Sequence, residues 1–227
     1  MSCNKILITK PKIEFLHYPQ VISCELLYSV YCLNLGIIQK ILQYDTLLIS
    51  SLNGAKSLIQ NLCLYANTSI FDVIKKKHVL SIGKKTYEFL KEHSFENLFL
   101  PFDTLQSLIM NVNLRNVLYL SGYHTTFENW CDYSVKRIII YKAIERKLNN
   151  NIKHMIYSGE ISHIVLYSKR SAELLLNNFF KDYDFLNIQF ICMSENVASL
   201  LKHYSAIFPE TPTEKSMNNL IQKILKS

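Results

Sequence analysis

One pattern occurs twice in this chain and limits what the chain can fold into. An apolar, strand-like run ends in a small polar loop and continues as an amphipathic, helix-like segment. The matching stretches are 46–58, 79–91 and 104–108 in the first half, and 163–175, 190–202 and 213–217 in the second half. Three matches in the same order, at offsets that fall from 117 to 109 residues, indicate two copies of one α/β unit. The length of 227 residues is sufficient for two such domains.

Strand-like runs alternate along the chain with segments whose apolar residues recur at spacings of three and four. The runs are 6–9, 29–33, 46–50, 79–82, 98–100, 116–120, 136–141, 163–167 and 189–193. Strands that alternate with helices form parallel sheets covered by helices on both faces. The sequence therefore predicts an α/β fold with two parallel sheets.

The repeat also predicts how the domains are connected. The first strand and helix, within residues 5–33, have no counterpart in the first copy. We expect them to return to the second copy, which makes a discontinuous lobe of residues 1–33 plus 143–227 and an inserted lobe of residues 37–138. Residues 34–36 and 139–142 would then be two hinge strands, and a ligand would bind in the cleft between the lobes.

Charge and composition restrict the function. The net charge of +7 favours an anionic partner, but no nucleic-acid-binding motif with interleaved aromatic and arginine residues is present. The lysines at 75–77 and 84–85 form either a solvated face or, because two of them follow Gly83 at a strand-to-helix turn, an anion site. The chain has no apolar run of the ~18 residues that a membrane span needs.

Cysteine and histidine usage points to a reduced compartment and to no metal site. The six cysteines are irregularly spaced without a Cys-x-x-Cys pair, and the amino terminus has no signal-peptide pattern, so we expect a cytoplasmic protein. The seven histidines form no His-x-His or His-Glu-x-x-His pattern. The lack of a heptad pattern makes a monomer the expected state.

Several stretches together resemble the uroporphyrinogen-III synthase family over almost the whole chain. They are 6–11, 44–51 with Asn53-Gly54, 81–86, 117–122, 140–142, 158–168 and Pro212-Thr213. The resemblance implies two flavodoxin-like α/β lobes joined by a two-stranded hinge, with an active-site cleft between them. It also implies a cyclising hydro-lyase of haem and tetrapyrrole biosynthesis that converts hydroxymethylbilane, a linear tetrapyrrole with eight carboxylates, to uroporphyrinogen III. Water is lost, the terminal pyrrole ring is inverted, and no cofactor is used.

The resemblance assigns site residues. Tyr141 matches the hinge tyrosine that helps the substrate hydroxyl to leave, and the alternative is an aromatic side chain that only packs against a lobe. The expected substrate-binding residues are Ser51, Asn53, Gly83, Thr86, Gly122, Ser168, Lys169, Ser171 and Thr213. Ser, Thr and Asn at these turns are also strong helix N-caps, so capping is the alternative role for several of them.

The chain departs from the family at two turns, and this leaves a second function open. The loop 121–126 lacks the family's arginines, and Ser194 and Val197 replace a glycine and a threonine in the second copy. The alternative is a two-lobed small-molecule binding or regulatory protein that has lost catalysis. A third hypothesis, nucleic-acid binding, rests on charge alone. A transient contact with porphobilinogen deaminase, which would hand over the unstable substrate, is left open by the resemblance.

Overall fold

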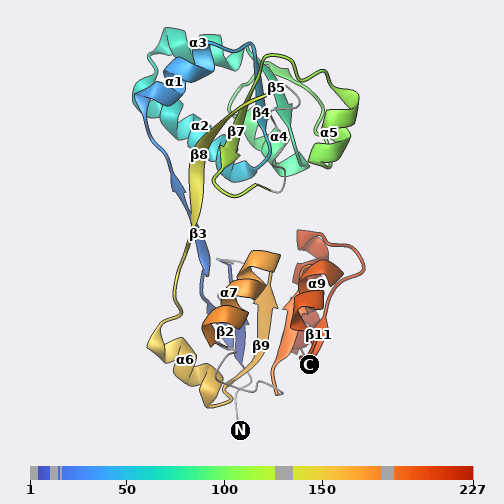
Figure 1. Cartoon of the computed structure of the whole chain (residues 1–227). Helices are drawn as coiled ribbons and strands as arrows, with labels where there is room; N and C mark the ends of the chain where they lie inside the picture. Colours follow the sequence, from blue (N-terminus) through green and yellow to red (C-terminus); the bar gives the residue numbers. More distant parts are fainter. Residues whose placement is uncertain (1–4, 11–14, 16, 126–134, 180–186, 227) are drawn as a thin grey trace. The chain divides into compact units, whose positions relative to one another are not determined.

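The computed structural model describes residues 5–10, 15, 17–125, 135–179 and 187–226. The chain divides into two compact units (Figure 1). Unit 1 consists of Met1–Tyr28 and Glu145–Ser227, and unit 2 of Ser29–Ile144. Unit 1 therefore contains both the blue start and the orange and red end of the chain in Figure 1.

Unit 2 holds most of a six-stranded sheet in the order β3-β8-β7-β4-β5-β6, in which only the start of β3 and the last residue of β8 belong to unit 1. Its strands are β3 (Leu27–Tyr31), β4 (Thr46–Ile49), β5 (His78–Ser81), β6 (Asn97–Leu98), β7 (Val117–Gly122) and β8 (Lys136–Glu145). The strands from β8 to β6 pair in parallel. β3 runs antiparallel to β8, because Cys32 N donates to Ile140 O at 2.8 Å and Arg146 N donates to Leu26 O at 2.9 Å.

Helices cover both faces of this sheet. They are α1 (Leu35–Leu42), α2 (Leu52–Tyr65), α3 (Thr68–Lys75), α4 (Lys84–Glu92) and α5 (Leu105–Asn111). Alternate residues of β4 point to opposite faces, so Leu47 and Ile49 pack in the core with α1 to α4, and Leu48 packs with Leu108 of α5. β7 divides in the same way, and its Tyr119 lies on the α5 face.

Unit 1 contains a five-stranded, all-parallel sheet in the order β11-β10-β9-β1-β2. Its strands are β1 (Lys5–Ile8), β2 (Val21–Ser23), β9 (Ile161–Leu166), β10 (Gln189–Cys192) and β11 (Ala206–Ile207). Its helices are α6 (Asn150–Tyr157), α7 (Lys169–Phe179), α8 (Glu195–Ala198) and α9 (Glu214–Lys226). One face of the sheet packs against α6, α7 and α8, and the other against α9.

The predicted α/β fold with parallel sheets is confirmed, but the position of one expected strand is wrong. Of residues 34–36, expected as a hinge strand, Asn34 is instead the N-cap of α1, and residues 35–36 begin that helix. Asn34 caps this helix, and its side chain accepts a hydrogen bond from Gly36 N at 2.7 Å. The strand before it, β3, ends at Tyr31. An asparagine cap therefore ended the extended segment earlier than its apolar pattern suggested. No helix within the described ranges has the length and apolar character to cross a membrane.

Candidate active site

The carboxyl ends of β4, β5 and β7 share one edge of the unit 2 sheet, because these strands are parallel neighbours. A pocket of about 260 Å³ lies at this edge. It is lined by Ser50, Ser51, Ile82, Leu105, Tyr119, Gly122, His124, Thr125 and Tyr141. Three of the predicted site residues, Ser51, Gly122 and Tyr141, are therefore brought together by the fold.

Ser51 links the start of helix α2 to Tyr141. Its Oγ accepts a hydrogen bond from Gly54 N at 3.1 Å and forms a second one with Tyr141 Oη at 2.9 Å. Gly54 lies close to the sheet, because a Cβ there would be in van der Waals contact, at 3.4 Å, with Leu120 O and Ile49 Cγ2. The sequence Ser-x-x-Gly thus places a capping hydroxyl close enough to the sheet to reach the phenol of Tyr141.

Gly122 makes room for the Tyr141 ring. A Cβ at residue 122 would lie 2.6 Å from Tyr141 Cζ and 2.7 Å from its hydroxyl oxygen. Real Cβ atoms essentially never approach other atoms this closely, so any side chain here would displace the phenol. Gly122 therefore has a steric role besides the substrate contact that the sequence suggested. Tyr141 also packs against the core of unit 2, so the packing role named as its alternative is present too.

The Tyr141 hydroxyl is held in its neutral form. Burial raises the pKa of Tyr141 above its usual value of 10.0, and nearby Tyr119 adds to the rise. The hydrogen bond with Ser51 opposes this rise in pKa, because it favours the phenolate. The phenol therefore keeps its proton near neutral pH and can donate it, while Ser51 is positioned to stabilise the resulting anion.

A second hydroxyl pair lies in the same pocket and was missed from the sequence. Ser50 Oγ and Tyr119 Oη lie 2.6 Å apart, in hydrogen-bond contact. Tyr119 is only 2% exposed, yet it lines the pocket. The sequence did contain a sign of this pair: Tyr119 stands within the apolar start of β7, and a buried phenol usually has a hydrogen-bond partner.

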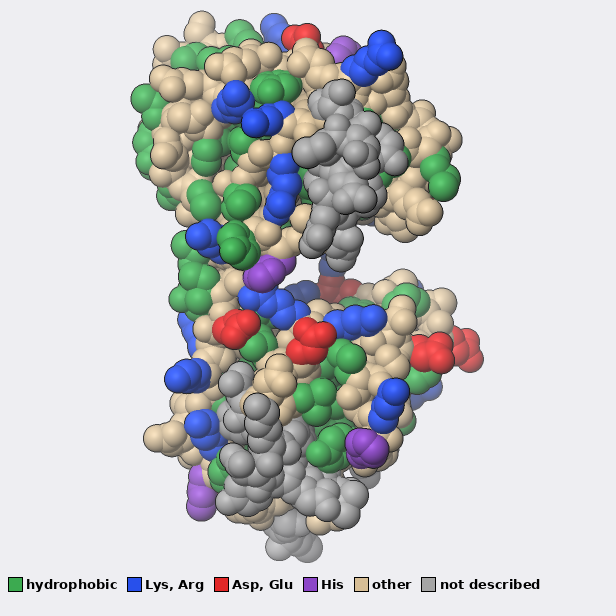
Figure 2. Space-filling view, in the orientation of Figure 1, with side chains coloured by type: hydrophobic (Ala, Val, Ile, Leu, Met, Phe, Trp, Pro, Cys, Tyr) green, Lys and Arg blue, Asp and Glu red, His purple; other side chains and the backbone are tan. Residues whose placement is uncertain are grey.

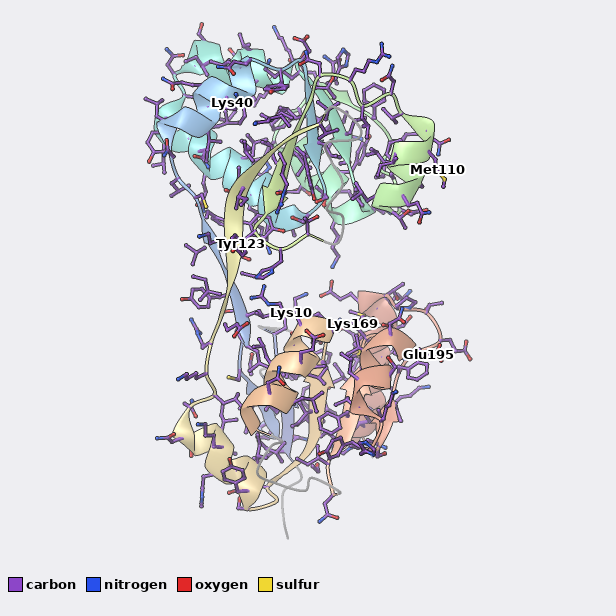
Figure 3. The ribbon with its side chains drawn as sticks, viewed as in Figure 1. Lys10, Lys40, Met110, Tyr123, Lys169 and Glu195 are labelled. Atoms are coloured by element: carbon purple, nitrogen blue, oxygen red, sulfur yellow. The ribbon has the colours of Figure 1, made fainter. Side chains whose placement is uncertain are left out.

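An arginine of the neighbouring strand β8 hydrogen-bonds to the loop after β7. Arg137 of β8 donates from Nε to Ser121 Oγ, and from Nη2 to the carbonyl oxygens of Gly122 and Tyr123, each at 2.8 Å. Tyr123, labelled in Figure 3, marks the position of this loop. The sequence suggested that this loop offers no obvious cation. The described loop residues 121–125 indeed include no lysine or arginine, but Arg137 of the neighbouring strand places a guanidinium group against them. Residue 126 of the predicted loop lies outside the described residues.

Three other predicted residues of unit 2 do not line this pocket. Asn53 lies in the first turn of α2, and Thr86 is buried in α4 with 3% of its surface exposed. Gly83 has φ of 78°, a left-handed conformation that favours glycine, and it forms the N-cap position of α4. Gly83 N donates to Phe102 O at 2.8 Å. The glycine thus serves the turn itself.

The lysines expected as a solvated face or an anion site make separate local contacts. Lys75 Nζ lies 4.6 Å from the centre of the Phe71 ring, and Lys77 Nζ donates to Tyr44 O at 2.5 Å. Lys84 pairs with Glu88 one turn later in α4 at 3.6 Å. On the face seen in Figure 2, basic side chains are spread over both units. These contacts favour the interpretation as a solvated face.

In unit 1, three predicted residues meet at the start of α7. Ser168 Oγ accepts from Ser171 N at 3.1 Å and lies 2.8 Å from Ser171 Oγ. Lys169, labelled in Figure 3, is the first residue of the helix and is exposed, and it has no ion pair within the described part of the chain. The nearby Lys10, by contrast, pairs with Glu214 at 3.6 Å.

The remaining two turns of unit 1 differ from each other. Thr213 is exposed, and its Oγ1 accepts a hydrogen bond from Ser216 N at 3.1 Å at the start of α9. Ser194 precedes the four-residue helix α8, and its side chain makes no capping hydrogen bond. The capping role named as an alternative is thus observed for Ser51, Ser168 and Thr213, and it leaves their role in substrate binding as a prediction.

Comparisons with known proteins agree with this fold. A family model described as "Uroporphyrinogen-III synthase HemD" matches residues 35–219. The structure of a uroporphyrinogen-III synthetase from Helicobacter pylori has a TM-score of 0.67 at 15% identity and covers 97% of this chain and 99% of its own. A mutant uroporphyrinogen III synthase from Thermus thermophilus has a TM-score of 0.66 at 9% identity and covers 98% of each chain.

The two solved structures, at these identities, show the fold, and the family model shows the membership. No curated protein matches the chain in sequence. The family model extends over most of the chain and includes Ser51, Gly122 and Tyr141 of the pocket as well as Ser168 of unit 1. The chain therefore belongs to the uroporphyrinogen-III synthase family.

Proposed function

We propose that this chain closes hydroxymethylbilane to uroporphyrinogen III, with loss of water and inversion of the terminal ring. Membership of the family places its function in tetrapyrrole biosynthesis. The observation that carries the proposal is the hydrogen-bonded pair of Ser51 and Tyr141 in the pocket at the carboxyl edge of the unit 2 sheet. A neutral phenol at such an edge is suited to protonating a leaving hydroxyl.

In the proposed reaction, Tyr141 donates its proton to the hydroxyl of the substrate, which leaves as water. The lone pair of the adjacent pyrrole nitrogen expels it, and an azafulvenium cation forms. The substituted carbon of the last ring attacks this cation and gives a spiro intermediate. The bond from that carbon to its original methylene bridge then breaks and leaves a second azafulvenium cation. The free α-carbon of the same ring attacks the released methylene carbon, so the ring closes in the inverted orientation. The proton lost when that ring becomes aromatic again restores the Tyr141 phenol, so one water is released overall. Ser51 stabilises the phenolate in between.

The pocket fits this role by its size and by a lining without acidic residues, lysine or arginine. Its volume of about 260 Å³ is below the ~300–1,000 Å³ of pockets that enclose drug-sized ligands, so it holds one part of a tetrapyrrole. Its polar lining consists of the hydroxyl groups of Ser50, Ser51, Tyr119, Thr125 and Tyr141, together with His124 and backbone. Neutral hydroxyls stabilise a transient cation without neutralising it by bond formation.

We assign the substrate carboxylates to the helix starts. Lys169 offers an ammonium group that has no ion pair among the described residues, and its helix α7 offers backbone amides near the Ser168 cap. The other proposed contacts are Ser51, Asn53, Gly83, Thr86, Gly122, Ser171 and Thr213. Their side chains or backbone amides would position a flexible chain of four rings, which is the larger part of the catalytic task.

We further propose that the enzyme is a cytoplasmic monomer and that porphobilinogen deaminase delivers its substrate. The deaminase product is unstable in solution, which makes a transient contact between the two enzymes useful. Sedimentation of the purified chain, alone and with the deaminase, tests the monomeric state and the contact, and coupled rates test the delivery. A stable dimer of the chain would contradict the monomer. A second protein that binds free hydroxymethylbilane without converting it can be added to the coupled assay. If the rate of type III formation then falls in proportion to the hydroxymethylbilane that is bound, direct delivery is contradicted.

The test of the function is a coupled assay in which hydroxymethylbilane is made in situ. An active synthase yields the type III isomer, whereas a binding or regulatory protein leaves only the type I product of spontaneous closure. The same assay on a folded Tyr141→Phe variant tests the proton donor. Exclusive type I product from the wild-type chain would overturn the proposed reaction and favour the binding protein.

A further inference from the structure

Helix α2 carries two buried polar side chains where apolar ones would be expected. Ser57 and Asn61 are both 0% exposed, and they lie one turn apart on the same face of the helix. Their helix neighbours Leu58 and Leu62 belong to the apolar core of unit 2. Buried polar groups are costly unless they are hydrogen-bonded, so their partners indicate what they do.

Ser57 bonds to the residue that immediately precedes Tyr141. Its hydroxyl donates to the carbonyl oxygen of Ile140 at 2.5 Å, and Cys32 N donates to the same oxygen at 2.8 Å. Ile140 is the extra residue of a bulge in β8, because Ser121 pairs with Ile139 whereas Gly122 pairs with Tyr141. The bulge brings Tyr141 opposite the one residue, Gly122, that leaves space for its ring.

Asn61 completes the network. Its Nδ2 donates to Ser57 O at 2.9 Å and to Cys32 O at 3.0 Å, and its Oδ1 accepts from Asn34 N at 3.0 Å. The side-chain amide thus uses both of its donors and its acceptor. Asn61 thereby holds residues 32–34, the segment that follows β3. This segment hydrogen-bonds to the bulge, because Cys32 N donates to Ile140 O.

One helix therefore fixes Tyr141 at two points. Its N-cap Ser51 bonds to the phenol oxygen, and Ser57, about 9 Å further along the helix, bonds to the peptide carbonyl before Tyr141. We propose that Ser57 and Asn61 are positioning residues for Tyr141: they hold the β8 bulge and so keep the phenol against Gly122 and Ser51. The effect on turnover rests on the proposed function, whereas the effect on the placement of the phenol does not.

Loss of the Ser57 hydroxyl would leave the Ile140 carbonyl with Cys32 N alone. The pairing of β8 with β7 could then return to a regular register, and a shift of one residue turns a strand side chain to the opposite face. Tyr141 would lose its place opposite Gly122. Its hydroxyl would leave Ser51, and its ring would become more exposed to solvent.

The first measurement is the kinetics of Ser57→Ala. We expect kcat to fall about ten- to a hundredfold with KM changed less than about twofold, since a misplaced donor affects the chemical step. Ser57→Thr keeps the hydroxyl and should recover most of the lost turnover. Leu62→Val is the matched control, because it alters the same buried helix face without touching the network, and it should keep wild-type kcat at a similar loss of thermal stability. Equal kcat for Ser57→Ala and Leu62→Val would overturn the proposal.

The second measurement combines Ser57→Ala with Tyr141→Phe. If Ser57 acts only through Tyr141, the double variant is no slower than Tyr141→Phe alone. Multiplicative losses would show an independent role and contradict the proposal.

The third measurement is independent of activity. The absorbance titration of the Tyr141 phenol, taken as the difference from a Tyr141→Phe background, should move toward the ordinary tyrosine range in Ser57→Ala, because the ring is less buried. An unchanged titration would overturn the proposal even if the proton-donor role holds. A shifted titration with full activity of Tyr141→Phe would instead keep the positioning role and reject the proton donor. Asn61→Ala takes the place of Ser57→Ala in all three measurements if the latter does not fold.

Discussion

Unit 1 and unit 2 use the same strand, loop and helix, yet the turn after the second strand of the repeat differs. In unit 2, Gly83 has a left-handed φ of 78° and leads into the nine-residue helix α4. In unit 1, Ser194 has an extended φ of −158° and leads into α8, which has four residues. A glycine-to-serine difference between the copies therefore accompanies a change of turn and a shorter helix.

The serines at the first turn of each copy also have different partners. Ser51 caps α2 and reaches the phenol of Tyr141, whereas Ser168 caps α7 and bonds, within the described residues, to the amide and hydroxyl of Ser171. The unit 2 edge has the phenols of Tyr119 and Tyr141 and an arginine engaged by carbonyls, while the unit 1 edge has the exposed Lys169. The difference suggests chemistry at unit 2 and carboxylate binding at unit 1, and the following predictions test it.

The largest expected effect is that of Tyr141→Phe. Removing the proposed acid should lower kcat by at least tenfold, toward the ~10²–10⁴-fold loss that is typical of general-acid groups. Product isomers and single-turnover rates in the coupled assay provide the measurement. Circular dichroism confirms that the variant is folded, and wild-type turnover by such a protein would remove Tyr141 from the mechanism.

Lys169→Ala should weaken substrate binding and leave the chemical step intact. We expect KM to rise about tenfold with kcat nearly unchanged, because a hydrogen bond to a charged partner is worth about 1.5–3 kcal/mol. Steady-state kinetics at two salt concentrations measure the change, and the salt dependence of KM should weaken in the variant. The matched control is Lys202→Ala, another exposed lysine of unit 1. A loss confined to kcat would contradict the division of roles.

Tyr119→Phe tests whether the second phenol of unit 2 acts with the first. It removes the hydrogen bond to Ser50, and with it one contribution that raises the pKa of Tyr141. We expect turnover to fall about threefold, in line with the loss of one neutral hydrogen bond of ~0.5–1.5 kcal/mol. The isomer ratio and kcat are the readouts. A loss of turnover as large as that of Tyr141→Phe would contradict the supporting role of Tyr119 and make it a candidate for the proton donor.

The raised pKa of Tyr141 predicts an alkaline effect on stability. The unfolded chain loses this proton near pH 10, whereas the folded chain keeps it to higher pH. The stabilisation is therefore complete below pH 10 and is lost as the pH rises through the pKa of the folded state. Urea unfolding should show a steeper loss of the free energy of unfolding above pH 10 in the wild type than in Tyr141→Phe. Parallel curves for the two proteins would contradict the raised pKa.

The smallest expected effect comes from the strands that precede the turns at Gly83 and Ser194, which are β5 and β10. Ser81 of β5 is fully buried, and its hydroxyl has no hydrogen-bond partner among the residues described, while its counterpart in β10 is the buried Cys192. Ser81→Ala should raise the free energy of unfolding by about 1 kcal/mol, because an unsatisfied buried hydroxyl costs ~1–3 kcal/mol. Burial raises the pKa of the Cys192 thiol to about 12, so this cysteine should resist thiol reagents in the native state. Destabilisation by Ser81→Ala would show that Ser81 has a partner.

Local patterns were sufficient for much of the fold. The alternation of apolar runs and amphipathic segments predicted the parallel sheets, and the strand-end serines predicted the turns at Ser51 and Ser168 correctly. The apolar pattern failed at residues 34–36, where a single asparagine cap started a helix. Short strands such as β2 and β11, with three and two residues, were too short to give a pattern.

The site was less accessible to sequence reasoning because its contacts join distant segments. Ser50 and Tyr119 are 69 residues apart, and Ser57 and the Ile140 carbonyl are 83 apart. Arg137 reaches the loop after β7 from the neighbouring strand, which no local spacing indicates.

Periodicity and turn chemistry were enough to indicate a duplicated α/β unit, because they are local properties of the chain, and the resemblance of several stretches to a known family indicated the membership that the family model shows. The placement of Tyr141 depended on the tertiary structure. It needs a bulge at Ile140, an absent side chain at Gly122 and the hydroxyls of Ser51 and Ser57 from one helix. Only the packing of α2 against β7 and β8 brings these together.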